Sequence, residues 1–361
     1  MKSSALTGLL VLAFTLLAPT ARAEIMIDYS DDLANNNFFG SNPTARLALE
    51  AAVADINAVL TTNLGAITND VTQGVSGSFS PQTILNFDFS YNYTNPATGL
   101  STTITDTTLS ANQYKLFVGA QNLGGSTLGR AGPGGAGFSL SGQGGFGSIA
   151  DAIADAEANH QHHRGDGPTM LTLTGNVSGD PYSFDVGATI GSAWFDQDTN
   201  NDGFADSTSE LEASWHFDHT IPVAPGKFDF YSVALHETLH SLGIGGSDSW
   251  NALLSGASDW LGPEVIALNG DGIGVIDSVS GAHFATGLMS TRISDGMPQE
   301  VVMDPNILSG TRKSLTDLDL AILRDIGWST QVTAIPEPSS LLVLSAVTMV
   351  VVVTSRRSRD H

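Results

Sequence analysis

The segment that decides the fold contains the stretch His236–Asp248, "HETLHSLGIGGSD". Just before it, Asp229 can cap a helix that starts at Phe230, and Gly243 can end that helix. Between these limits, apolar residues recur at helical spacing and form one stripe: Tyr231, Leu235, Leu239 and Leu242. The pattern therefore predicts a helix of about three turns with one buried face.

Two histidines of this helix project from the same face. His236 and His240 are four residues apart, which is the spacing that two ligands of a single tetrahedral zinc ion need. Glu237 lies beside them and does not need to bind the ion. It can take a proton from a zinc-activated water and pass it to the leaving amine of a cleaved peptide. The pattern predicts zinc-dependent peptide hydrolysis with Glu237 as the catalytic residue.

The order His-Glu-x-x-His-x-x-Gly over residues 236–243 resembles the helix motif of the metzincin zinc peptidases. Compact metzincins place a third ligand three residues after the glycine, where this chain has Gly246. In leishmanolysin-like metzincins an insertion follows the helix, and a histidine usually followed by an aromatic residue returns later. His283-Phe284 fits that arrangement, which implies a zinc site of His236, His240 and His283. Asp248 and the pair His216 and His219 remain alternatives for the third ligand.

The same resemblance implies a methionine turn beneath the zinc and a closing helix. Met303 in "VVMDPNI" lies 24 residues before Gly327 and is favoured for the turn over Met289 in "GLMSTR". In "SLTDLDLAILRDIGW", Thr316 and Asp319 form a capping box, and the apolar residues after them give a buried face. The likeness covers about Asp229–Trp328. It implies an α/β (α+β) metzincin-like domain over residues 24–333, with a twisted mixed sheet, an active-site helix and a loop-rich lower part.

A second ion is suggested by "DQDTNNDGFAD". Alternating oxygen ligands around a tight turn are what calcium requires, and this stretch is similar to the calcium loops of dockerin and thrombospondin repeats. The ligands would be Asp198, Asn200, Asp202 and Asp206. A plain acidic hairpin loop is the alternative.

Both ends of the chain indicate export. Residues 1–23 have the charged, apolar and small-residue regions of a secretory signal peptide. In residues 334–361, Pro336-Glu337-Pro338 precedes the apolar run Leu341–Val353 and an arginine cluster. That order resembles the PEP-CTERM signal of Gram-negative bacteria, which implies an exosortase-type partner and a transient membrane anchor. A simple C-terminal anchor is the alternative. Either way we expect a protein of the cell surface or extracellular matrix.

The composition fits this location. The chain has 37 acidic and 14 basic residues, a net charge of −23, which argues against nucleic acid and anionic membrane surfaces as partners. The absence of cysteine excludes disulfides and thiolate metal sites. The expected partner is a protein or peptide substrate. Two alternatives stay open: a non-enzymatic surface or matrix protein that retains the peptidase fold, and a calcium-stabilised adhesin.

The rest of the chain predicts the framework of the domain. Residues 42–64 read as a helix, and β-type patterns occur over residues 78–120 and 169–195. Residues 122–147 are rich in glycine and are predicted to form a surface loop. His160, His162 and His163 match no defined metal spacing and are expected in an exposed turn.

Overall fold

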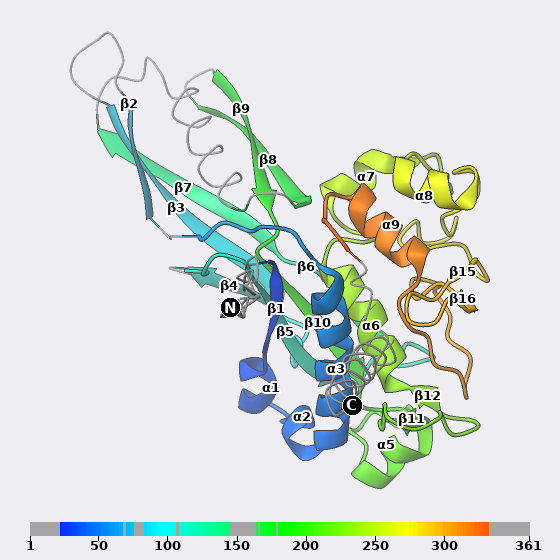
Figure 1. Cartoon of the computed structure of the whole chain (residues 1–361). Helices are drawn as coiled ribbons and strands as arrows, with labels where there is room; N and C mark the ends of the chain where they lie inside the picture. Colours follow the sequence, from blue (N-terminus) through cyan, green and yellow to red (C-terminus); the bar gives the residue numbers. More distant parts are fainter. Residues whose placement is uncertain are drawn as a thin grey trace, which may run out of the picture.

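The computed structural model describes residues 22–67, 70–75, 83–105, 108–143, 164, 167–177 and 180–331. Within these residues, eight helices and several sheets form a mixed structure compatible with the predicted α+β class (Figure 1). Residues 1–21 of the predicted signal peptide, the C-terminal segment 334–361 and the three histidines 160, 162 and 163 lie outside the described residues. No helix in the described part of the chain is long and apolar enough to span a membrane.

A central mixed sheet has the strand order β1-β5-β10-β6. Strands β1 (Glu24–Asp28), β5 (Gln113–Gln121) and β10 (Ile190–Asp196) are parallel, whereas β6 (Gly129–Pro133) runs antiparallel to β10. The register pairs Phe195 with Gly129 and Trp194 with Arg130. Strand β6 is therefore the terminal strand of this sheet, and its outer edge faces away from β10.

The prediction of a surface loop over residues 122–147 was wrong for much of that segment. The described part contains β6 and β7 (Gly135–Gln143). The glycines here permit close packing of neighbouring strands. A Cβ atom on Gly134 would lie 2.5 Å from Ile190 Cγ1 and 2.9 Å from the carbonyl oxygen of Asn92. A glycine run looks like a loop in sequence because it lacks side chains, but here neighbouring strands occupy that space.

A second sheet and a hairpin project from the central sheet (Figure 1). The second sheet contains β2 (Asp70–Val75), β3 (Thr83–Thr94), β4 (Ser101–Thr105) and β7. The hairpin consists of β8 (Thr169–Val177) and β9 (Asp180–Gly187). A hydrophobic cluster that includes Phe89, Tyr93, Phe117 and Phe184 joins these strands to the central sheet.

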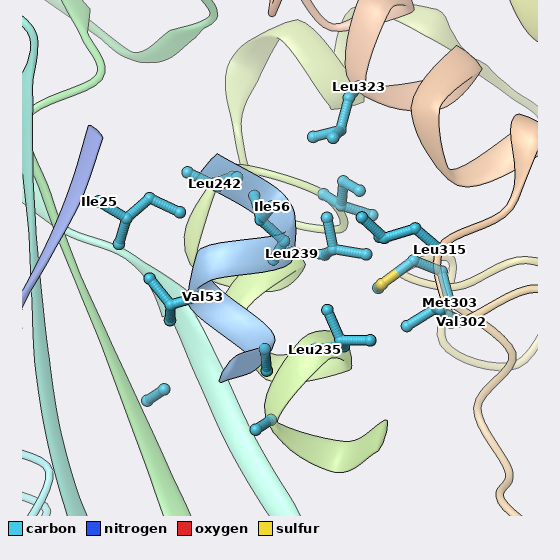
Figure 2. Close-up of a cluster of buried hydrophobic side chains, with 14 of the residues drawn as sticks. Ile25, Val53, Ile56, Leu235, Leu239, Leu242, Val302, Met303, Leu315 and Leu323 are labelled. Atoms are coloured by element: carbon cyan, nitrogen blue, oxygen red, sulfur yellow. The ribbon is translucent and has the colours of Figure 1, made fainter. Parts of the chain in front are cut away.

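Two helices pack together against the central sheet. Helix α3 (Pro43–Val59) contacts β1, and helix α6 (Phe230–Ser241) contacts α3, β10 and β6. The predicted helix over residues 42–64 is thus confirmed, with an earlier end. Figure 2 shows Leu235 and Leu239 of α6, and Leu242 directly after it, among the apolar side chains of this core. Two short helices, α1 (Ser30–Ala34) and α2 (Phe38–Ser41), precede α3.

The chain around and after α6 consists mainly of loops with short elements. Before α6 come α5 (Thr208–Ser214), β11 (Trp215–His216) and β12 (Phe228–Asp229). After it come α7 (Asp248–Leu253), β13 (Leu254–Ser255), β14 (Asp259–Trp260), α8 (Pro263–Asn269), β15 (Met289–Thr291), β16 (Pro298–Glu300) and α9 (Asp317–Asp325). The predicted closing helix is α9, and the predicted capping box of Thr316 and Asp319 is present.

Candidate metal centre

Helix α6 begins and ends where the sequence predicts. The Asp229 carboxylate caps it by accepting from the backbone N–H of Ser232 at 3.1 Å. Asp229 is fully buried, and the guanidinium of Arg312 donates to both of its oxygens, at 3.0 and 2.7 Å. At the other end, Gly243 has φ of 107°, a left-handed conformation that stops the helix. The helix is therefore held in place by a charge pair that links residues 83 apart in sequence.

The chain after α6 makes a close approach that brings a third histidine to the helix. Gly245 has φ of 83°, and a Cβ atom there would lie 2.6 Å from the carbonyl oxygen of Ala282. Residues 246–282 form an insertion whose Trp250 and Trp260 rings lie 4.6 Å apart and belong to the main hydrophobic core. Trp260 Nε1 donates to Asp325 Oδ2 of α9 at 2.9 Å. The insertion is thus fixed to the body of the protein, and it ends at His283.

The three imidazoles of His236, His240 and His283 converge. The Nε2 atom of His240 lies 3.1 Å from that of His236 and 3.0 Å from that of His283. The candidate ligand atoms all lie within 4.8 Å of one another, and no other group of three His, Cys, Asp or Glu residues does so in the part of the chain that the structure describes. Tetrahedral zinc with Zn–N bonds near 2.05 Å places its nitrogen ligands about 3.3 Å apart, close to these separations. The spacing of the triad therefore fits such an ion.

Each imidazole has a partner for its other nitrogen. His236 Nδ1 lies 2.8 Å from the Val302 carbonyl oxygen, His240 Nδ1 lies 2.9 Å from the Ile244 carbonyl oxygen, and His283 Nδ1 lies 3.0 Å from Ser280 Oγ. Since a carbonyl can only accept, the Nδ1 atoms of His236 and His240 carry the proton. Their Nε2 atoms then face each other as bare lone pairs.

Burial keeps these rings neutral. It lowers the pKa of His236 well below its usual value and that of His240 to about 4, and the neighbouring histidines add to both shifts. Burial also lowers the pKa of His283. Neutral rings with Nδ1 protonated have no proton to share across the short Nε2 contacts. Three neutral imidazoles with converging lone pairs are a donor set that a metal cation can bind.

Glu237 is the buried acid beside the triad. It is 5% exposed, and burial raises the pKa of its carboxyl to about 8, against which the charge of Arg130 acts. Its side chain packs against the backbone of β6. A Cβ atom on Gly129 would lie 2.6 Å from Glu237 Oε1 and 2.7 Å from Glu237 Cγ. Only glycine at this position leaves room for the carboxyl in its present place.

A buried turn at Val302–Met303 joins the parts of the site. Met303 is fully buried, whereas Met289 is 53% exposed on β15. Figure 2 shows Val302 and Met303 near Leu315, on the side of the core that Leu235 and Leu239 face. The Met303 carbonyl accepts from the N–H of Phe284 at 2.9 Å, directly after His283 in the chain. Through its backbone, the turn thus contacts both His236 and Phe284, the residue after His283.

The triad opens into a cavity of about 700 Å³. Residues 126–133, which include β6, line one wall, and the chain after Met303 lines another, including Asp304 and Ile307. Glu237 and the three histidines lie between these walls. All five residues of β6, the terminal strand of the central sheet, line this cavity.

The other candidate ligands lie elsewhere. The Asp248 carboxylate has another partner: its Oδ2 accepts from the backbone N–H of Thr172 in β8 at 2.7 Å. His216 is buried in β11, and the His219 ring stacks on Tyr231 with centroids 6.3 Å apart. Neither is part of the converging group.

The acidic loop lies directly after β10 and is held by its own backbone. Asp198 accepts from the N–H groups of Asp202 and Gly203, Asn200 from that of Asp202, and Asp202 from that of Phe204, all at 2.9–3.0 Å. Asp206 Oδ2 accepts from Thr199. The carboxylates of Asp198, Asp202 and Asp206 do not converge as a group of three. Calcium binding here stays a prediction.

Several residues of the site were missed in sequence. Gly129 was hidden in a segment interpreted as a loop, and Arg312 gives no local signal because its partner is 83 residues away. Ser280 and Asp277 precede His283 by three and six residues, and a turn of the chain brings these three side chains into contact. The short separation from a candidate ligand could have drawn attention to Ser280.

No protein-family model, curated protein or solved structure matches this chain.

Proposed function

We propose that this chain is an exported zinc-dependent endopeptidase of the metzincin type, with the leishmanolysin-like arrangement of ligands. The single observation that carries the proposal is the convergence of three Nε2 lone pairs beside a buried glutamate. His236 and His240 come from one helix and His283 from the end of an insertion. The sequence resemblance supports the same three residues and the same glutamate.

The geometry divides the chemistry among the residues. Zinc at the triad would polarise the scissile carbonyl and lower the pKa of the attacking water. The charge of a cation there would also lower the raised pKa of Glu237, so that its carboxylate can accept a proton at neutral pH. Glu237 then delivers that proton to the leaving nitrogen. The mostly buried carboxyl of Glu237 lines the cavity, and the missing side chain of Gly129 leaves room for it there.

The cleft suits an extended peptide. Strand β6 ends the central sheet and lines the cavity, so its outer edge can pair with the backbone of a substrate in β-conformation. A peptide paired with β6 in this way would run past Glu237 and the three histidines, because they line the same cavity. Recognition through the substrate backbone accepts many different side chains. This agrees with an exported endopeptidase that cleaves other proteins.

Zinc content and cleavage separate this proposal from its alternatives. The parent chain is expected to bind one zinc ion per chain and to cleave a denatured protein. Glu237→Gln is expected to keep zinc and to lose about 10²–10⁴ in rate, because the proton transfer is removed. His283→Ala is expected to weaken both. His219→Ala removes a histidine outside the triad and serves as the matched control.

The outcomes point to different functions. A parent that binds zinc and cleaves nothing would favour the non-enzymatic surface protein that retains the fold. A parent without zinc and without activity would overturn the peptidase proposal. Unchanged zinc affinity and rate in His283→Ala would overturn only the choice of third ligand.

A further inference from the structure

The third histidine is oriented differently from the other two. His236 and His240 direct Nδ1 to backbone carbonyls, whereas His283 Nδ1 lies 3.0 Å from the side-chain oxygen of Ser280. The Ser280 hydroxyl in turn lies 2.7 Å from Asp277 Oδ2. A carboxylate, a hydroxyl and an imidazole therefore form a chain that ends at the metal side of the cleft.

The direction of the hydrogen bonds in this chain is forced. A carboxylate only accepts, so the Ser280 hydroxyl uses its one proton on Asp277. Ser280 Oγ can then only accept from His283, and Nδ1 of His283 must carry the proton. The Nε2 atom is left with a bare lone pair, and it is the atom that lies 3.0 Å from His240 Nε2. The pair thus selects the tautomer that can bind a metal.

The turn that carries Asp277 and Ser280 is held by its own hydrogen bonds. Asp277 Oδ2 also accepts from the Ser280 N–H at 3.0 Å, and the Asp277 carbonyl accepts from the Gly281 N–H at 2.8 Å. Asp277 N–H donates to the His283 carbonyl at 2.9 Å. Ile276 and Phe284, on either side of the turn, are buried and bridge to each other. The turn therefore holds His283 although its tip is exposed.

We propose that Asp277 and Ser280 are positioning residues that fix the third imidazole in its metal-binding tautomer and orientation. This inference rests on the proposed zinc centre. His283 comes from the end of an insertion and lacks the fixed helical geometry that orients the other two rings. The side-chain relay replaces that support. Without it the ring can rotate or move its proton to Nε2, where it would oppose a cation.

The expected effect is modest and measurable. Loss of an outer partner of a metal ligand typically costs 10- to 100-fold in metal affinity. Ser280 is exposed, so water can replace part of its hydrogen bond. We expect Ser280→Ala to weaken zinc binding about tenfold, at the lower end of that range. Asp277→Asn keeps an oxygen acceptor without the charge and should give a smaller loss.

The experiment measures zinc affinity of the full chain by competition with a chelator, and the His283 tautomer by ¹⁵N NMR of the zinc-free protein. Ser280→Thr keeps the hydroxyl, so its zinc affinity and its His283 tautomer should match those of the parent. Ser278→Ala removes an exposed serine of the same turn and is the matched control. His283→Ala sets the loss expected when the ligand is absent. Ser280→Ala should fall between the control and His283→Ala, with the Nε2-protonated form appearing in the spectrum.

The results distinguish this inference from the proposed function. If Ser280→Ala binds zinc like the parent and keeps the Nδ1 proton, the positioning role is wrong while the zinc centre stands. If Ser280→Thr loses affinity as much as Ser280→Ala, the effect is not due to the hydroxyl, and the relay is again wrong. A parent chain that binds no zinc would overturn the proposed metal centre. The positioning role of Asp277 and Ser280 would then fall with it, whichever tautomer of His283 the spectrum shows.

Discussion

At the scale of single residues, the site depends on two glycines whose missing Cβ atoms leave room for close contacts. Gly129 lets β6 approach Glu237, and Gly245 lets the chain after α6 pass against Ala282. Neither position would accept a Cβ atom without movement, because the shortest contact of such an atom would be 2.6 Å at each. The two glycines thus allow the present positions of Glu237 and of the segment that leads into His283, the proposed base and the proposed third ligand.

Gly129→Ala should separate catalysis from metal binding. The new methyl group would push the Glu237 side chain, which is flexible, so we expect the fold and zinc content to be retained. A displacement of about 1 Å at a catalytic group can cost on the order of 10²-fold in rate. The rate of peptide cleavage is therefore expected to fall at least tenfold. Gly135→Ala, where a Cβ atom would meet only Asn92 Nδ2 at 3.7 Å, is the control. Full activity in Gly129→Ala would show that Glu237 is not held there.

At the scale of elements, helix α9 does more than close the fold. Its capping residue Asp319 is fully buried, and besides Thr316 it accepts from the backbone N–H groups of Val302 at 3.0 Å and Met303 at 3.2 Å. The Val302 carbonyl holds His236 Nδ1. The N-terminus of α9 is thereby connected, through one turn of backbone, to a metal-ligand candidate on α6.

Asp319→Asn is expected to weaken this connection. An amide nitrogen would replace one carboxylate oxygen and face a backbone N–H, which leaves a buried donor without an acceptor. Such a group costs about 1–3 kcal/mol, so the free energy of unfolding should fall by roughly 2 kcal/mol. Urea denaturation of the full chain measures it, and zinc affinity should fall with it. Asp317→Asn, in the same first turn, should cost less than about 1 kcal/mol. Equal effects of the two variants would contradict the role of Asp319.

At the scale of the whole molecule, the core sets the protonation state of the site. The three imidazoles lie between α6, the insertion and the Val302–Met303 turn, and burial is the main cause of their lowered pKa values. The chain carries a net charge of −23, yet the rings stay neutral because desolvation disfavours the imidazolium form. The fold therefore prepares the rings for a cation over a wider pH range than free histidine allows.

Zinc affinity should consequently resist acid. For a group with a lowered pKa, protons compete with the metal only below that pKa, which is about 4 for His240. Between pH 7.5 and 5.5 the affinity should change less than about tenfold. Three rings with the ordinary pKa near 6.5 would together lose about 10³-fold by pH 5.5. The titration is best done in Glu237→Gln, because the glutamate, with its pKa raised to about 8, would add its own proton. A loss of several hundredfold would contradict the prediction.

The sequence by itself determined the local parts of this protein. Helices α6 and α9, their caps and the pairing of His236 with His240 on one face follow from side chains within a few residues of each other. The strands β5 and β10 follow from short apolar runs with β-type residues. These features depend on backbone propensity and periodicity, which a local window contains.

Only the tertiary structure decided how those parts meet. From the sequence, the third ligand could be His283, Asp248 or the pair His216 and His219. Of these, the path of the insertion brings only His283 to the helix histidines, 43 residues beyond His240. The same holds for Arg312 on Asp229, for Asp319 on the Val302–Met303 turn and for the glycine segment that became β6. Contacts between distant residues depend on where loops return, and the space beside a glycine is set by its neighbours. Neither quantity is contained in a local stretch of sequence.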